Sequence, residues 1–244
     1  KKEQLEEDNS LGTSLIDMYM KHGAFEEACH VFYEQKVRTV VSWTLLIAGY
    51  AEQGFITEIH NSIQQMQLDG ISPNAVTLTC CFKACTLSGC MDLGRESHNM
   101  VIKLGFDQDT FVGNHIIDMY AKCDALQKAK DVFEKLSVRD VVTWNSLLAG
   151  YAQHKLSEEA LNCFRLMQDE GVHPDEVTYI CVLKACSIVG SLETGEGINV
   201  DIRKQGLLQN DMVLGNALLD MYVKCGVLQK AQEVFEQLPL QDVV

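Results

Sequence analysis

Cysteine and histidine side chains are the groups in this sequence that could support metal binding or nucleophilic catalysis. The chain has 10 cysteines and 7 histidines. No C-x-x-C pair occurs among them, and no histidine is followed two positions later by glutamate. The first pattern is typical of zinc sites, and the second belongs to the zinc-deaminase signature. The sequence therefore predicts no metal site.

The cysteines recur at fixed places in a repeating pattern. Cys85 and Cys186 both follow Lys-Ala, and Cys123 and Cys225 both follow Lys. Such recurrence favours packing positions in structural units. The sequence also has no phosphate-binding loop, nucleophile elbow or paired catalytic dyad. We therefore expect a protein that is not an enzyme and that uses no cofactor.

The composition is that of a folded protein, with 47% apolar and 22% charged residues. Its net charge of −14 disfavours DNA as a partner, because duplex binding needs a basic surface. No apolar run approaches the roughly 18 residues of a membrane span, so no membrane partner is expected. The first residues, KKEQLEED, resemble neither a signal nor a transit peptide. Because no initiator Met is present, we interpret the sequence as part of a longer protein.

The elements that must position any functional residues repeat along the chain. Residues 110–140 and 212–242 are identical at 16 of 31 positions, and residues 9–39 form a weaker copy. Two further kinds of unit lie between these copies, in a fixed order. The predicted repeats are 9–39, 40–74, 75–109, 110–140, 141–175, 176–211 and 212–242, with 1–8 ending a preceding repeat and 243–244 starting the next.

Each repeat is predicted to form two antiparallel helices. In the 141–175 repeat, Trp144, Leu147, Leu148 and Tyr151 recur at a helical spacing, and a second apolar face follows a short turn. A hairpin of about 35 residues cannot bury its own apolar stripe, so stacking is required. We expect an all-α, right-handed superhelical solenoid. First helices should line its concave side, and the more acidic second helices its convex side.

Glycine occupies the turn between the two helices in most repeats. Asp124 and Lys155 replace it in two of them. These replacements are expected to cost little if the turn is relaxed.

Specific motifs resemble one known family. VVTWNSLLAGYAQ with GVHPD, a following unit with VLKAC, and GNALLDMYVKCG with AQEVF closely resemble pentatricopeptide repeat proteins. Tetratricopeptide repeats share the hairpin but lack these motifs. The alternating lengths resemble the plant PLS subclass, over essentially the whole chain. By this resemblance 9–39, 110–140 and 212–242 are S-type, 40–74 and 141–175 are P-type, and 75–109 and 176–211 are L-type.

The resemblance implies that each repeat binds one base of a single-stranded RNA. In the family the fifth and last residues of a repeat read the base, and the second residue clamps it. The matching readers are Thr44 with Asn74, Thr79 with Asp109, Asn114 with Asp140, Asn145 with Asp175, and Asn216 with Asp242. The matching clamps are Val41, Phe111, Val142 and Val213. Thr13 with Thr39 departs from the usual combinations, and Ile180, paired with Asp211, cannot hydrogen-bond a base.

The side chains fit this role chemically. An amide such as that of Asn145 offers a donor and an acceptor, whereas the carboxylate of Asp175 only accepts. The carboxylate should favour uracil or guanine, which carry a ring N–H, over cytosine. By resemblance Asn with Asp implies uracil, Thr with Asn adenine, and Thr with Asp guanine, with weak reading by L-type repeats. These polar residues also suit helix caps and turns, and that alternative stays open.

Lysines recur near the end of the first helix in the 31-residue repeats, at Lys21, Lys122 and Lys224. They could contact RNA phosphates, or they could remain solvated near helix-terminal carbonyls.

The subclass implies a role in an organelle, chloroplast or mitochondrion, choosing sites for cytidine-to-uridine RNA editing. The chemistry would come from a further domain or from accessory proteins. A tetratricopeptide-like protein-binding scaffold is the alternative, and the net charge of −14 is its best support.

Overall fold

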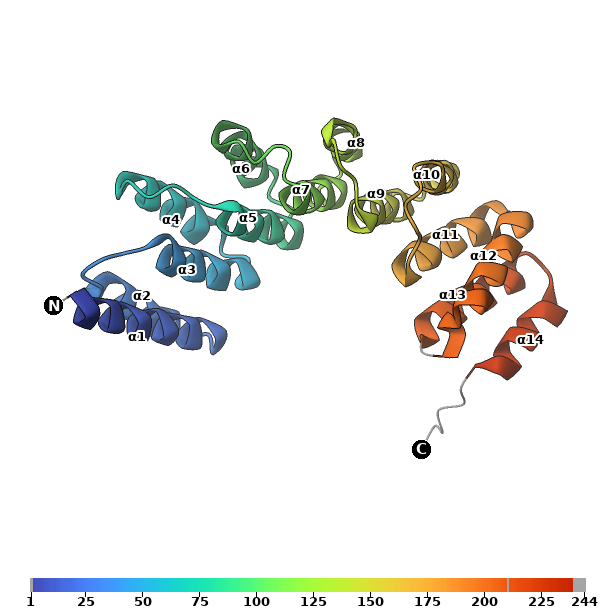
Figure 1. Ribbon diagram of the computed structural model, residues 1–244, viewed down its shortest axis with the longest axis horizontal. Helices are drawn as coiled ribbons and strands as arrows, with labels where there is room; N and C mark the ends of the chain where they lie inside the picture. Colours follow the sequence, from blue (N-terminus) through green and yellow to red (C-terminus); the bar gives the residue numbers. More distant parts are fainter. Residues whose placement is uncertain (1, 210, 239–244) are drawn as a thin grey trace. The chain divides into compact units, whose positions relative to one another are not determined.

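The computed structural model describes residues 2–209 and 211–238 (Figure 1). In these ranges the chain forms fourteen α-helices and one short 3-10 helix, and no strand. The prediction of an all-α fold is confirmed. The helices group into two compact units that meet in sequence at Ser137 and Val138.

The first unit is a stack of four helical hairpins. First helices α1, α3, α5 and α7 pack on one another in succession, and α4, α6 and α8 lie along one side of them (Figure 1). The helix bounds are α1 Lys2–Lys21, α2 Phe25–Glu34, α3 Val40–Gln53, α4 Ile56–Leu68, α5 Ala75–Ser88, α6 Met91–Leu104, α7 Thr110–Lys122 and α8 Leu126–Lys135.

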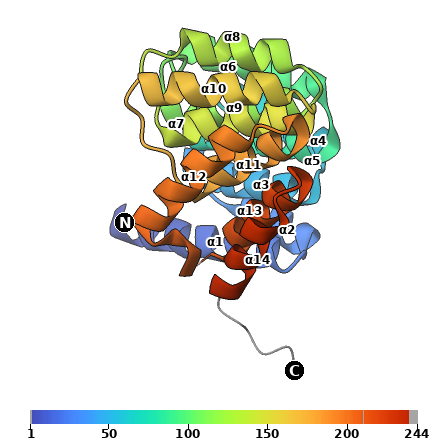
Figure 2. The same ribbon diagram turned by 90° about the vertical axis from the view of Figure 1, so that its right-hand side faces the viewer.

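The second unit has the same arrangement with three hairpins. First helices α9, α11 and α13 pack in succession, and α10, α12 and α14 lie along one side of them (Figures 1 and 2). The bounds are α9 Val141–Gln153, α10 Ser157–Asp169, α11 Glu176–Val189, α12 Leu192–Gln205, the 3-10 helix Leu207–Gln209, α13 Met212–Lys224 and α14 Leu228–Gln237.

Large apolar side chains of the first helices form the core between hairpins. Trp43 in α3 is fully buried, and its ring lies edge-on against Phe32 with 4.5 Å between ring centroids. Trp144 occupies the same position in α9 and is 1% exposed. Truncating such a buried tryptophan typically costs about 3–5 kcal/mol, so these positions fix the spacing of the helices that carry the polar residues discussed below.

The turn within each hairpin is not relaxed where glycine is missing. Lys155 and Asp124 both have a φ of 57°, in the left-handed region that Gly54 occupies with a φ of 71°. The backbone bond that closes the turn is also kept, from Leu156 N to Tyr151 O at 2.9 Å. The expected low cost therefore does not apply, because a side chain in this conformation costs roughly 1–2 kcal/mol.

Helix α1 crosses the repeat boundary that the sequence places between residues 8 and 9. It runs without interruption from Lys2 to Lys21. The segment before residue 9 has no proline or glycine and consists mainly of Lys, Glu and Gln, which favour helix. Nothing local therefore stops the helix at that boundary.

The later first helices begin at the first residue of each proposed repeat, from Val40 to Met212. Their assignment to P, L and S types remains a prediction. No helix among the described residues combines the length and apolar character that a membrane crossing requires.

Candidate nucleic-acid interface

The last residue of each of the first six proposed repeats is the N-cap of the next first helix. Its side chain accepts a hydrogen bond from a backbone amide of the first turn, at 2.9 Å for both Asn74 and Asp175. The six N-caps are Thr39, Asn74, Asp109, Asp140, Asp175 and Asp211. Asp242 lies outside the described residues. The capping role is therefore observed, and base reading by the same residues remains a prediction.

In four of these helix starts, a serine or threonine lies three residues after the N-cap. The hydroxyl accepts a hydrogen bond from the N-cap backbone, which makes a reciprocal capping box. These residues are Ser42, Thr77, Thr143 and Thr178, and all are at most 1% exposed. We did not single them out from the sequence, although the pattern Thr/Asn/Asp-x-x-Ser/Thr at each repeat start is a usable signal.

The fifth residue of each repeat lies about one turn after the N-cap of its first helix. Thr79, Asn114 and Asn145 are 5%, 7% and 8% exposed. Thr44 is half-buried, and Asn216 is exposed. A buried amide or hydroxyl must find hydrogen-bond partners, so the local network decides which atoms it presents.

Asn145 and Asp175 are hydrogen-bonded to each other. Asn145 Nδ2 donates to Asp175 Oδ1 at 2.9 Å and to Oδ2 at 3.1 Å. Thr178 Oγ1 donates to Asn145 Oδ1 at 2.7 Å, and the Thr178 backbone N–H donates to Asp175 Oδ1 at 2.9 Å. Two residues that are 30 positions apart thus form one polar cluster, held by the helix that follows them.

This cluster has a defined polarity. The amide nitrogen of Asn145 faces the carboxylate, and its oxygen faces the hydroxyl of Thr178. An amide carries two N–H donors and a carboxylate accepts several bonds. The pair can therefore present an N–H donor beside a carboxylate acceptor. Uracil, with a carbonyl next to a ring N–H, is complementary to that arrangement.

Thr44 and Asn74 are linked in the first unit through the hydroxyl of Thr77. Thr44 Oγ1 and Thr77 Oγ1 are 2.7 Å apart, and Thr77 Oγ1 donates to Asn74 Oδ1 at 2.9 Å. Because Asn74 Oδ1 also accepts from the Thr77 backbone, the Asn74 amide nitrogen must point away from the cap. It is a donor, which suits the ring acceptor of adenine.

The two proposed L-type pairs lack this connection. Thr79 Oγ1 donates to the backbone oxygen of Val76 at 2.9 Å, and Asp109 accepts from Val112 N at 3.1 Å. Among the described residues no hydrogen bond joins Thr79 to Asp109. Thr178 is the third residue of the repeat that follows its pair. The equivalent residue is Val112 after the 75–109 repeat and Leu214 after the 176–211 repeat.

The residues of the remaining predicted pair, Asn114 and Asp140, belong to different units. Asn114 lies in α7 of the first unit, and Asp140 caps α9 of the second, where Thr143 N donates to Asp140 Oδ1 at 2.8 Å.

The second residues form an apolar row on the first helices of each unit. The predicted clamps Val41, Phe111, Val142 and Val213 are 52–60% exposed although they are apolar. Val76 and Val177 hold the same position in the L-type repeats, are 51% and 52% exposed, and were not among the predicted clamps. Exposed apolar side chains at a regular spacing are suited to contact with flat, apolar surfaces such as base faces.

The three lysines expected near phosphates are engaged in ion pairs. Lys21 Nζ lies 2.7 Å from Asp17, Lys122 Nζ 2.9 Å from Asp118, and Lys224 Nζ 2.8 Å from Asp220. The bond to Asp17 raises the pKa of Lys21. Exposed pairs of this kind contribute little stability, so a phosphate could compete for the lysine. The DMY-x-K motif nevertheless places a negative charge beside each positive one.

The buried cysteines are poorly suited to nucleophilic chemistry. Burial raises the pKa of Cys85, Cys163 and Cys186 to about 12, so their thiols stay protonated near neutral pH. Within the described residues, no group of three Cys, His, Asp or Glu side chains could hold a metal ion.

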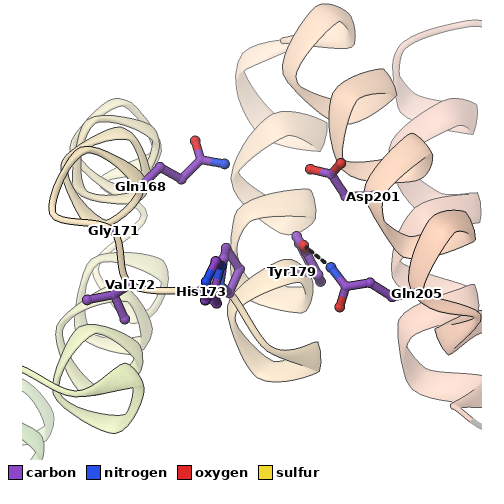
Figure 3. A pocket seen from close by; sticks show the side chains of 8 residues that line it. Gln168, Gly171, Val172, His173, Tyr179, Asp201 and Gln205 are labelled. Atoms are coloured by element: carbon purple, nitrogen blue, oxygen red, sulfur yellow. Dashed lines mark hydrogen bonds between the residues drawn. The ribbon is translucent and has the colours of Figure 1, made fainter.

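A cavity of about 450 Å³ lies in the second unit, between α10, the loop after it, α11 and α12 (Figure 3). Gln205 Nε2 donates to the Tyr179 hydroxyl across it at 3.0 Å. The lining residues are Gln168, Gly171, Val172, His173, Pro174, Tyr179, Asp201 and Gln205. None of the predicted readers, clamps or lysines lines this cavity.

Comparison with family models finds PPR repeats along the chain. The model for the PPR repeat family matches residues 38–86 and 139–187. The model for the PPR repeat matches residues 13–34, 114–141 and 216–242. Together these matches cover more than half of the chain.

Similar curated proteins come from Arabidopsis thaliana. "Pentatricopeptide repeat-containing protein At2g03380, mitochondrial" is 38% identical over 100% of this chain and 35% of its own length. "Pentatricopeptide repeat-containing protein At3g09040, mitochondrial" is 35% identical over 96% of this chain and 23% of its own length. The chain thus spans about a third or less of these relatives.

The fold resembles a solved repeat protein. The crystal structure of the pentatricopeptide repeat protein PPR10 in complex with an 18-nt psaJ RNA element has a TM-score of 0.73. It is 19% identical, and the match covers 93% of this chain and 34% of that one. At this identity the likeness concerns the fold alone.

Proposed function

Because the chain belongs to the pentatricopeptide repeat family, we propose that it binds single-stranded RNA sequence-specifically, with one base bound by each repeat. The fifth and last residues of a repeat read the base edge. The exposed second residues of neighbouring first helices clamp its faces.

The proposed sequence preference follows from the paired residues. With the 5′ end of the RNA at the N-terminal repeat, repeats from Val40 onward prefer A, weakly G, U, U, any base, and U. Consecutive uracils arise because the 110–140 and 141–175 repeats both carry Asn with Asp. The last U depends on Asn216 with Asp242.

The observation that carries this proposal is the bond between Asn145 and Asp175. The two side chains form a donor–acceptor edge one turn from the exposed clamp Val142. A helix cap alone has no need of a side-chain partner on the preceding first helix. A base-reading pair does, because both groups must be held at one place.

The wider role that we propose is target recognition for an organelle RNA-processing factor that acts in cytidine-to-uridine editing. The PLS-like order of repeat lengths and the mitochondrial relatives support it. The present chain supplies recognition. Catalysis would reside in another domain or in an accessory protein.

The test is a binding titration of the 244-residue chain against two labelled RNAs. One contains AGUUAU, and the other contains the same bases permuted, in identical flanks. We expect the first RNA to bind more tightly by at least fivefold, since each good base contact contributes about 1 kcal/mol or more. Equal binding of the two RNAs contradicts sequence-specific reading. Absence of binding to either RNA favours the protein-scaffold alternative.

A further inference from the structure

A buried hydroxyl from the following repeat connects the two proposed base readers. In the second unit this is Thr178, which is fully buried at the third position of α11. Its Oγ1 lies 2.7 Å from Asn145 Oδ1 and accepts from the Asp175 backbone N–H at 3.2 Å. It therefore touches both readers although it belongs to neither reading position.

The hydroxyl is placed to fix the direction of the amide. Thr178 Oγ1 accepts from the Asp175 backbone, and its hydroxyl lies within donating distance of two acceptors, Asn145 Oδ1 at 2.7 Å and Asp175 Oδ1 at 2.8 Å. With the amide oxygen held there, the nitrogen must face the Asp175 carboxylate. If the amide turned over, its oxygen would face the carboxylate, so that two acceptors would meet, and the hydroxyl would keep only Asp175 Oδ1 as an acceptor.

The same connection is found in the other proposed P-type repeat and not in the two proposed L-type repeats. Thr77 joins Thr44 to Asn74 in the first unit. After the two L-type repeats the position holds Val112 and Leu214, which are buried and have no hydroxyl. Thr44 and Thr79 both donate to a backbone oxygen of their own helix, at Val40 O and Val76 O. The difference is that, among the described residues, no side chain connects Thr79 to Asp109.

We propose that this third-position hydroxyl is a specificity-determining positioning residue, which orients the fifth-residue side chain toward the base. Its absence after L-type repeats is the physical reason for their weak reading. This inference rests on the proposed function, since it concerns how the same pairs recognise a base.

The first test uses Thr178→Val and Thr178→Ser. Valine keeps the shape and removes the hydroxyl, whereas serine keeps the hydroxyl. The measurement is the ratio of affinities for RNAs with U or C opposite the 141–175 repeat. We expect wild type and Thr178→Ser to prefer U by about fivefold, and Thr178→Val by about twofold or less.

A purely structural role for Thr178 predicts another pattern. Loss of the capping box alone would weaken binding to both RNAs by the same factor and leave their ratio unchanged. The A-to-G ratio opposite the 40–74 repeat, measured with the same proteins, is an internal control and should not move. An unchanged U-to-C ratio in Thr178→Val overturns the positioning role.

The second test adds the hydroxyl where it is missing and does not depend on the first variant folding. Val112→Thr places it beside Thr79 and Asp109. We expect the preference for G over A opposite the 75–109 repeat to rise by about threefold or more. No rise contradicts the inference.

The proposed function and the positioning role of Thr178 are contradicted by different results. If wild type shows no preference at any repeat, the proposed function is wrong. If wild type discriminates and neither Thr178→Val nor Val112→Thr changes a ratio, only the positioning role is wrong.

Discussion

The side-chain amide of Asn145 donates to both carboxylate oxygens of Asp175, at 2.9 and 3.1 Å. The same carboxylate caps α11 by accepting from Thr178 N. One aspartate thus stabilises the start of a helix and holds a polar side chain on the preceding first helix. Variants at this position must separate the two contributions, and the chain offers a matched pair of caps for doing so.

The substitution Asp175→Ser should relax or reverse the preference for U over C opposite the 141–175 repeat. Serine is itself a good N-cap, so the helix start is largely kept. Its hydroxyl can donate to the ring nitrogen of cytosine, which a carboxylate cannot. We expect a change of about 1 kcal/mol in the U/C difference, measured by titration with a matched pair of RNAs.

Asp211→Ser is the control for that experiment. Asp211 also caps a first helix, α13, by accepting from Val213 N and Leu214 N, but its partner in the 176–211 repeat is Ile180, which cannot bond a base. This variant should change no base preference. If Asp175→Ser and wild type discriminate equally, Asp175 serves only as a helix cap.

The recurrent lysines should contribute to affinity without regard to sequence. Replacing Lys122 and Lys224 with Ala should weaken binding to all RNAs about equally. The salt slope should become shallower by roughly 0.7 per lost phosphate contact. The measurement is affinity as a function of salt concentration for two unrelated RNAs.

The partner aspartates give the opposite test. Asp118→Asn and Asp220→Asn remove the charges that lie 2.9 and 2.8 Å from these lysines. Binding should become tighter for every RNA, because the lysines are released and two negative charges are lost. If neither the double lysine variant nor the double aspartate variant changes the affinity for RNA, these lysines are solvated and do not contact RNA.

The turn at Lys155 should be a site where glycine stabilises the protein. Lys155 has a φ of 57°, and the hydrogen bonds that close the turn come from the backbone and not from its side chain. Lys155→Gly removes the strain, and after the entropic cost of glycine the gain should be about 0.5–1 kcal/mol. The same change at Asp124 should gain less, because aspartate tolerates this conformation better.

The measurement for these variants is the thermal unfolding midpoint. Gly54→Ala is the reverse control, since it places a side chain at a φ of 71°, and it should lower the midpoint. A Lys155→Gly protein that melts no higher than wild type would show that the turn conformation carries no cost.

Stability should fall as the pH rises above about 9. Burial raises the pKa of Cys163 to about 12, whereas an exposed thiol in the unfolded chain ionises near 8.5. The unfolded state therefore releases a proton that the folded state retains, and alkali favours unfolding. The contribution is fully present below the unfolded pKa and is lost as the pH rises toward 12.

The check is the unfolding midpoint between pH 7 and pH 11 for wild type and for Cys163→Ala. The variant is expected to be less stable at pH 7 because it leaves a small cavity. Its midpoint should nevertheless fall less steeply with pH. Parallel curves would show that Cys163 does not contribute to the alkaline loss.

The sequence by itself determined the helical repeats, because their signal is local and is repeated. Apolar residues at helical spacing, such as Trp144 to Tyr151, and turn residues at a fixed interval predict hairpins that must stack. The later first helices begin where the pattern places a repeat start. The exposure of the clamp positions also follows from their place on the helix, opposite the buried tryptophans.

The tertiary structure decided which atoms meet. Three contacts were outside the reach of the sequence pattern: the amide of Asn145 on Asp175, the hydroxyl of Thr178 between them, and the pairing of Lys122 with Asp118. It also showed that Lys155 is strained and that α1 continues past residue 8. Periodicity fixes the face on which a side chain lies. Its hydrogen-bond partner depends on the distance between neighbouring hairpins, which the packing of their buried side chains sets.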